Sequence, residues 1–258
     1  MAQWNSQQYL KFEKERTQPA IDLAARIPLE HPQAVLDIGC GPGNSTHVLA
    51  QRFPEANILG VDQSLPMLEQ AARQYPDLSF RQLDAHTELP TLGQRFDVVF
   101  SNACIQWVPD HPRLLREMMA LLRPGGVLAV QVPMNQREPI HQIIAQTVAG
   151  AAWKDKFPHP RIFYTLTQEE YFDRLGAELT PDFTVWETIY GHRMPSHDSI
   201  MEWYKGTGLR PYLADLSEQD AARFEREIAE QVALAYPLQA NGEILFRFPR
   251  FFFLAVKQ

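Results

Sequence analysis

The feature that most constrains the fold is a short apolar run that ends in a glycine-rich turn, Val35-Leu36-Asp37-Ile38-Gly39-Cys40-Gly41-Pro42-Gly43-Asn44-Ser45-Thr46. The apolar run predicts a buried strand, and a helical pattern begins at Asn44 directly after the turn. Glycines lack a Cβ atom, so they permit a tight turn and let backbone N–H groups approach a ligand closely. These N–H groups also lie at the positive end of the helix that follows. The stretch therefore predicts a strand, a ligand-binding turn and a helix in direct succession.

Three further apolar runs end on polar residues. The run 58–61 ends at Asp62, the run 79–83 ends at Asp84-Ala85, and the run 96–100 leads into Ser101-Asn102-Ala103. A carboxylate one βα unit after a glycine turn suits the two hydroxyls of an adenosine ribose, and the next acidic strand end suits an adenine amino group. Polar residues at the carboxyl ends of neighbouring strands line the ligand crevice of an open α/β sheet, so these strand ends predict one binding site.

Between residues 33 and 133 the strand and helix patterns alternate, which predicts a parallel sheet with right-handed crossovers. A helical lead-in over 4–28, interrupted at Pro19, precedes them. Strands are expected at 34–38, 57–61, 79–83, 96–100 and 127–132, and helices at 44–53, 65–75 and 111–122. The stretch 121–126 is expected to be a helix end followed by a turn.

After Pro133 the rhythm changes. Thr167 and Glu170 have the spacing of a capping box, and Pro249 suggests an edge or a bulge in the last strand. Helices are expected at 140–153, 167–175, 196–205 and 217–235, and strands at 183–190 and 244–256. We interpret the helices between these two strands as a cap, with a core and N-terminal lid helix over 1–190, the cap over 191–240 and a final core strand over 241–258.

Composition narrows the function classes. The chain of 258 residues has a formal net charge of −7, which argues against nucleic acid as a partner because phosphate contacts need a basic surface. No apolar run is long enough to cross a membrane, and the N-terminus lacks a signal-peptide pattern. The two cysteines lack metal-ligand spacing with the histidines. We expect a cytoplasmic protein without metal and without an obligate protein partner.

Taken together, these motifs resemble the class I S-adenosylmethionine-dependent methyltransferases, including the turn Arg123-Pro124-Gly125-Gly126. The resemblance implies a Rossmann-like sheet of seven strands, mostly parallel with the last antiparallel, and helices on both faces. It also implies S-adenosylmethionine as cofactor and S-adenosylhomocysteine as product. Further motifs, among them 194–197, 207–211 and 248–250, resemble the subfamily that methylates trans-aconitate. They imply transfer to one carboxylate of this tricarboxylate, which gives a monomethyl ester.

The same resemblance assigns residues to the cofactor. Gly39 and Gly41 would line its methionine part, and Asp62 would bind the ribose, with Gln63 near the adenine. Asp84 and Ala85 would flank the adenine, while three residues would close the site beneath the sulfonium: Asn102, Gln106 and Trp107. The assigned set is completed by Asn44, Met67 and Ala103.

The acceptor side follows from the chemistry. A carboxylate is already ionised near neutral pH, so we assign no general base and expect positioning and water exclusion to drive an in-line displacement. A tricarboxylate on an acidic protein requires local cations, and arginine can donate two parallel hydrogen bonds to one carboxylate. The acceptor candidates are Tyr9, Arg16, Tyr190, His192, Trp203, Tyr204, Arg210 and Arg250. Core packing is the alternative for the aromatic residues, and a surface or helix-end role is the alternative for the arginines.

Three other functions compete with this interpretation. A nicotinamide-dependent dehydrogenase shares the glycine turn and the acidic strand end, but Gly39-Cys40-Gly41-Pro42-Gly43 lacks the usual G-x-G-x-x-G spacing. A non-catalytic protein could use the same site to bind S-adenosylmethionine. A methyltransferase of this type could also act on another small acid, such as cis-aconitate, isopropylmalate or citrate.

Overall fold

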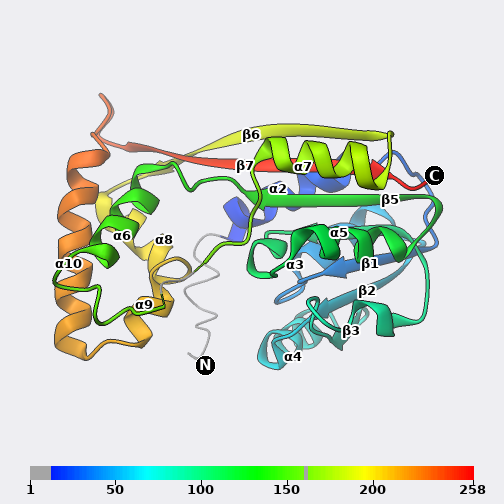
Figure 1. Ribbon diagram of the computed structural model, residues 1–258, viewed down its shortest axis with the longest axis horizontal. Helices are drawn as coiled ribbons and strands as arrows, with labels where there is room; N and C mark the ends of the chain where they lie inside the picture. The colour runs from blue at the N-terminus through cyan, green and yellow to red at the C-terminus, as the bar shows by residue number, and fades with distance from the viewer. Residues whose placement is uncertain (1–12, 160–161) are drawn as a thin grey trace. The chain divides into compact units, whose positions relative to one another are not determined.

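The computed structural model describes residues 13–159 and 162–258, with side chains from residue 17 onward (Figure 1). They belong to two compact units. The sheet unit comprises Arg16–Pro133, Phe163–Thr188 and Arg250–Gln258, and the helical unit contains Met134–Ile162 and Ile189–Pro249. No helix in these described ranges is long and apolar enough to cross a membrane.

Seven strands form one sheet in the order β3-β2-β1-β4-β5-β7-β6. The neighbours from β3 to β5 pair in parallel, whereas β7 pairs antiparallel with β5. The predicted fold class, a Rossmann-like and mostly parallel sheet of seven strands, is therefore confirmed. The strands are β1 (Ala34–Ile38), β2 (Asn57–Asp62), β3 (Ser79–Gln82), β4 (Phe96–Asn102), β5 (Leu122–Pro133), β6 (Phe183–Met194) and β7 (Ile244–Val256).

Helices cover both faces of the sheet within the sheet unit. On one face Phe252 stacks on Trp186, which in turn lies under the guanidinium of Arg26, just after α2. On the other face Phe251 and Phe253 pack against Tyr171 of α7. The helices of this unit are α2 (Glu13–Ala25), α3 (Asn44–Arg52), α4 (Leu65–Gln74), α5 (His111–Ala120) and α7 (Gln168–Arg174).

Local details differ from the sequence expectations at three points. Helix α2 continues through Pro19, because its buried face packs against the core on both turns that follow. Leu121 is the C-cap of α5, as expected for a helix end, but strand β5 begins at Leu122, which already pairs with Phe96. The expected turn is therefore part of an irregular strand start. Pro249 lies in an interior strand, where its carbonyl accepts a hydrogen bond from the Met134 backbone N–H at 3.0 Å. A proline is tolerated there because this contact needs only an acceptor.

The helical unit has its own apolar core. It contains α6 (Pro139–Ala149), α8 (His197–Lys205), α9 (Arg210–Ala214) and α10 (Glu218–Ala235). Helix α6 packs against α10, and the buried Trp153 donates a hydrogen bond from its Nε1 to Glu227 at 2.6 Å. Residues 134–162 therefore group with the helices that lie between β6 and β7 in the chain. This division differs from the expected ranges 1–190, 191–240 and 241–258, because the apolar face of α6 is buried in this core.

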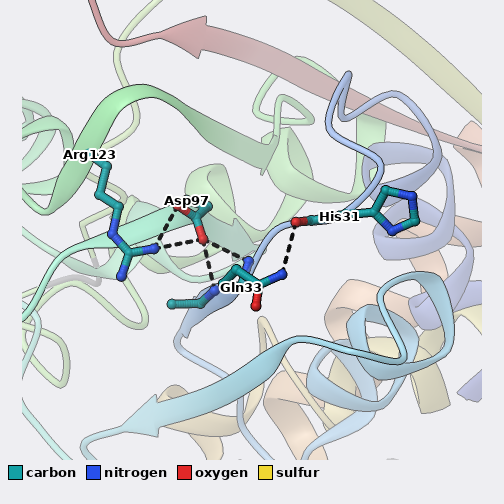
Figure 2. A network of polar contacts seen from close by, with 5 residues as sticks. His31, Gln33, Asp97 and Arg123 are labelled. Atoms are coloured by element: carbon teal, nitrogen blue, oxygen red, sulfur yellow. Dashed lines mark hydrogen bonds and ion pairs between the residues drawn. The ribbon is translucent and has the colours of Figure 1, made fainter.

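A polar network joins the amino ends of β1, β4 and β5 (Figure 2). The carboxylate of Asp97 accepts hydrogen bonds from the backbone N–H groups of Gln33 and Ala34 at 2.7 and 2.9 Å, and from Arg123 Nη1 at 2.8 Å. Partial burial would raise the pKa of Asp97, but these hydrogen bonds outweigh it and hold the pKa below its usual value. The network fixes three strands at the edge opposite the glycine turn.

We expect Asp97→Asn to lower the free energy of unfolding by about 1–3 kcal/mol at neutral pH, because charge-assisted hydrogen bonds are lost. The pKa of Asp97 is lower in the folded than in the unfolded protein, so its stabilisation is complete above the ordinary value of 3.8 and disappears as the pH falls below it. The variant and the unaltered protein should therefore converge in acid. Urea unfolding at several pH values tests this, with a substitution of an exposed acid, Asp77→Asn, as control. A difference in unfolding free energy between variant and unaltered protein that stays constant with pH would contradict it.

Candidate functional site

The glycine turn after β1 is held by backbone hydrogen bonds to β2. The N–H groups of Gly39 and Cys40 both donate to the Val61 carbonyl, at 2.8 and 3.0 Å, and the Gly43 N–H donates to the Cys40 carbonyl. All three glycines of the turn have positive φ angles, +75° at Gly39, +53° at Gly41 and +91° at Gly43. The sequence prediction of a glycine turn between a buried strand and a helix is confirmed.

Two of these glycines are required for different reasons. A Cβ atom at Gly39 would lie 2.1 Å from the Sγ of Cys104, so the turn after β1 and the segment after β4 touch with no room for a side chain. At Gly41 a Cβ atom would meet no described atom within 4 Å. Gly39 therefore serves close packing, whereas Gly41 exposes its backbone to open space in which a ligand could lie.

Asp62 binds directly to this turn. Its Oδ2 accepts a hydrogen bond from the Gly41 N–H at 3.0 Å, and its Oδ1 accepts one from the Ser64 N–H at 2.8 Å. Burial raises the pKa of the carboxyl, although both hydrogen bonds oppose the shift. Each carboxylate oxygen can accept more than one hydrogen bond. Asp62 is thus a fixed acceptor beside Gly41, and its ribose role stays a prediction.

Beneath the turn lies a second, fully buried acid. Asp37 Oδ2 accepts hydrogen bonds from Ser45 Oγ at 2.6 Å and from Thr46 Oγ1 at 2.7 Å, which attaches the first turn of α3 to β1. Its Oδ1 is buried and has no hydrogen-bond partner among the described residues. Burial raises the pKa of Asp37 to about 6, while the two hydroxyls lower it. Asn44 begins α3 directly above this anchor.

The end of β4 adds further oxygen acceptors. Ala103 has a positive φ of 52°, and its N–H donates to the Gln131 carbonyl at 3.0 Å. Gln106 donates from Nε2 to the Ala103 carbonyl at 2.7 Å. The side-chain oxygens Oδ1 of Asn102 and Oε1 of Gln106 are buried, and within the described ranges neither has a partner. Such atoms are costly unless something donates to them, which is consistent with a ligand at this edge.

The predicted adenine residues lie around the ends of β2 and β3. The Asp84 carboxylate accepts a hydrogen bond from the His86 N–H at 2.8 Å and so caps its own turn. Gln63 is exposed, and its carbonyl accepts a hydrogen bond from Gln82 Nε2. Met67 is buried on α4 and Ala85 is half-buried. These contacts are local, so the adenine roles of Gln63, Asp84 and Ala85 and the cofactor role of Met67 stay predictions.

The acceptor candidates are divided between the two units. Tyr9 and the side chain of Arg16 lie outside the described residues. Trp203 and Tyr204 are only 2 % exposed and pack in the aromatic core of the helical unit, which favours the packing alternative. The ring of His192 lies between those of Tyr190 and Trp203 in the same unit, at 6.3 and 5.0 Å.

The arginine candidates also differ in position. Arg210 is the first residue of α9 in the helical unit, and burial lowers its pKa. Arg250 belongs to the sheet unit, is 4 % exposed, and donates from Nη1 to Gln131 Oε1 at 3.1 Å. Arg250 thus shares a compact unit with the cofactor candidates, whereas Arg210 does not.

Gln131 was missed in the sequence analysis. It pairs in register with Asn102 on β4 and with Phe252 on β7, so these side chains lie on one face of the sheet. Arg250, two residues before Phe252, lies on that face as well. Gln131 is completely buried, and in the described part of the chain its Nε2 has no hydrogen-bond partner. Its position as the one amide in the apolar run 127–132 is the signal that could have identified it.

The strand order, the glycine turn and the acid at the end of β2 define an S-adenosylmethionine-dependent methyltransferase. Residues 35–126 match the family described as methyltransferase domain. The fold is similar to that of YcgJ from Bacillus subtilis (TM-score 0.59, 15 % identity, 95 % of this chain and 99 % of that one). It also resembles a phosphoethanolamine N-methyltransferase from Haemonchus contortus in complex with S-adenosylmethionine (TM-score 0.56, 19 % identity, 93 % and 53 %).

Sequence relatives narrow the class. The chain is 44 % identical to a trans-aconitate 2-methyltransferase of Agrobacterium fabrum over 99 % of both chains. It is 42 % identical to the trans-aconitate 2-methyltransferase of Escherichia coli over 99 % of this chain and 98 % of the relative. The chain belongs to the trans-aconitate 2-methyltransferase family. Its cofactor is S-adenosylmethionine. This molecule carries hydroxyl and ammonium donors, so it fits the open space at Gly41 and the acceptor oxygens at this sheet edge.

We expect Gly41→Ala to fold, at a cost of about 1 kcal/mol for the left-handed backbone, but to bind S-adenosylhomocysteine at least tenfold more weakly, because its methyl group enters the ligand space. Gly39→Ala should lower the free energy of unfolding by about 3 kcal/mol or more, since the added Cβ collides with Cys104. Urea unfolding and titration calorimetry measure the two effects. Unchanged affinity in Gly41→Ala would place the cofactor elsewhere.

Proposed function

We propose that this enzyme transfers the methyl group of S-adenosylmethionine to a carboxylate of trans-aconitate, releasing the monomethyl ester and S-adenosylhomocysteine. The observation that supports this most is the extent of the similarity. Identity of 42–44 % to enzymes named for this substrate covers 98–99 % of those chains, and so includes the helical unit as well as the methyltransferase domain at residues 35–126. The acceptor is therefore inferred from more than the shared cofactor domain.

In this proposal the cofactor binds along the carboxyl edge of β1, β2 and β4. Asp62 would accept hydrogen bonds from the ribose hydroxyls, since its oxygens lie beside the Gly41 backbone. The buried oxygens of Asn102 and Gln106, to which no described residue donates, would accept hydrogen bonds from the amino-acid end of the cofactor or face its positive charge. Asp84 and Ala85 would flank the adenine with Gln63 near it, and Met67 would complete the cofactor site.

The chemistry needs little acid–base help from the protein. When bound, S-adenosylmethionine supplies an electrophilic methyl group on a sulfonium sulfur. The acceptor carboxylate is already ionised near pH 7, so no side chain has to remove a proton. What the chain contributes is alignment and exclusion of water, because an anion and a cation attract each other more strongly in a dry site.

Arg250 is the residue that we propose for binding an acceptor carboxylate. It lies on the same face of the sheet as Asn102, at the edge where the cofactor is proposed to bind. The hydrogen bond to Gln131 orients its planar guanidinium. Such a fixed fork suits a carboxylate better than a flexible ammonium, since it can donate two parallel hydrogen bonds. Burial strengthens these bonds by reducing competition from water.

The proposed function is tested by transfer of labelled methyl from S-adenosylmethionine to a panel of acids. We expect trans-aconitate to have a kcat/KM well above those of cis-aconitate, isopropylmalate and citrate, and the label to appear in a base-labile ester. Asp62→Ala, which removes the proposed ribose acceptor, serves as the inactive control. Preference for another acid would overturn trans-aconitate as the proposed substrate. Cofactor binding without transfer to any of these acids would contradict methyl transfer to a small acid.

We expect Arg250→Lys to raise the KM for trans-aconitate about tenfold or more, because the lysine keeps the charge but loses the bidentate fork. The affinity for S-adenosylhomocysteine should change by less than about twofold, a change that corresponds to under 1 kcal/mol. The exposed Arg247→Lys, on the same strand, is the matched control. An unchanged KM in a folded Arg250→Lys enzyme would remove Arg250 from the acceptor site.

A further inference from the structure

A buried hydrogen-bonded chain lies behind the turn that follows β4. His111, the first residue of α5 and 1 % exposed, contacts the Ile105 carbonyl oxygen through Nε2 at 2.8 Å. Its other ring nitrogen, Nδ1, lies 2.7 Å from the hydroxyl of Tyr171 on α7. Tyr171 is completely buried between α5 and β7. The two side chains thus link α7 to the backbone of residue 105.

The direction of these hydrogen bonds follows from their partners. A carbonyl oxygen can only accept, so Nε2 of His111 carries the hydrogen and donates it to Ile105. In a neutral imidazole the other nitrogen is then an acceptor, and it takes the hydroxyl hydrogen of Tyr171. Burial lowers the pKa of His111 and raises that of Tyr171, which keeps both groups neutral. The Ile105 carbonyl therefore fixes the tautomer of His111, and the hydroxyl of Tyr171 satisfies the other ring nitrogen.

The chain ends on the turn that carries two of the predicted cofactor residues. This turn is the short 3-10 helix Ile105–Trp107. Two further contacts come from the segment that leads to α7: the Tyr164 N–H donates to the Gln106 carbonyl at 3.0 Å, and the ring of Phe163 packs on that of Trp107 at 4.7 Å. All three residues of the turn are thus held by contacts that originate in the segment 163–171, one of them through His111.

Capping of α5 does not explain this arrangement. The cap of α5 is Asp110, whose side chain accepts a hydrogen bond from the Arg113 N–H. An apolar side chain at position 111 could fill the same buried space without requiring a hydroxyl partner on another helix. What the imidazole adds is a donor of fixed direction toward the backbone of Ile105.

We propose that His111 is a positioning residue for the cofactor site, which acts through the Ile105 carbonyl and, with Tyr171 as its partner, fixes where Gln106 and Trp107 face the cofactor. The inference rests on the proposed cofactor roles of Gln106 and Trp107, and it adds two buried residues that touch neither cofactor nor substrate. It applies to any acceptor, because the turn lies on the cofactor side of the reaction.

Two substitutions distinguish the roles of the two ring nitrogens of His111. The amide nitrogen of His111→Gln can occupy the place of Nε2 and still donate to Ile105, whereas His111→Asn reaches only the place of Nδ1. Tyr171→Phe removes the hydroxyl that donates to Nδ1 and leaves this nitrogen buried without that partner. Thr167→Ala breaks the capping box of α7 and lowers the stability of the same helix without touching this chain. It is the control for a purely structural effect.

The measurements are S-adenosylhomocysteine affinity by calorimetry, kcat and KM for both substrates, and the midpoint of thermal unfolding. We expect His111→Asn to weaken S-adenosylhomocysteine binding and to lower kcat by about tenfold each, and Tyr171→Phe to do so by a smaller factor. His111→Gln should remain within about threefold of the unaltered enzyme. Thr167→Ala should lower the midpoint while the affinity and kcat stay unchanged.

Three results would overturn the inference. The first is a lower midpoint with unchanged affinity and kcat in His111→Asn. The second is a loss of affinity in Thr167→Ala as large as that in His111→Asn. If His111→Asn fails to fold, unchanged affinity in Tyr171→Phe is the third. Because S-adenosylhomocysteine binding needs no acceptor, failure of the unaltered enzyme to methylate trans-aconitate would count against the proposed substrate alone.

Discussion

The site depends on one steric constraint, the contact between Gly39 and Cys104. Because Gly39 has no side chain, the turn after β1 can lie directly against the segment after β4. This contact brings the backbone of the glycine turn, the Asp62 carboxylate that binds it and the oxygens after β4 to one sheet edge. At the opposite edge the hydrogen bonds of Asp97 stabilise the fold, because they fix the starts of three strands.

The polar atoms at the carboxyl edge are mainly acceptors. Asp37, Asn102 and Gln106 each bury an oxygen that no described residue satisfies, and Asp62 adds a carboxylate. A ligand with several donors and a positive charge would satisfy such a site, and S-adenosylmethionine is a ligand of this kind. The same atoms would repel an anionic acceptor. The proposed cation Arg250 lies farther along the sheet, on β7. The acceptor oxygens and the positive charge are therefore carried by different strands of one sheet.

Features that depend on neighbouring residues could be predicted from the sequence, and features that depend on strand register could not. The glycine turn, Asp62 at the end of β2 and the capping box at Thr167 each follow from a few adjacent residues. The pairing of Gln131 with Arg250 follows from the antiparallel register of β5 and β7, which periodicity does not determine. Likewise, the burial of Trp203 and Tyr204 and the packing of α6 on α10 depend on partners distant in sequence.

An enzyme that transfers a methyl group to an ionised carboxylate has little use for a proton acceptor but depends strongly on alignment. For the reaction proposed above, this difference is consistent with a buried polar chain that contacts the backbone of the turn after β4. His111 and Tyr171 are held neutral by burial, so they are unsuited to exchange protons with a substrate, yet they are well suited to fix a backbone carbonyl. In the proposed arrangement these two titratable side chains therefore serve geometry rather than proton transfer.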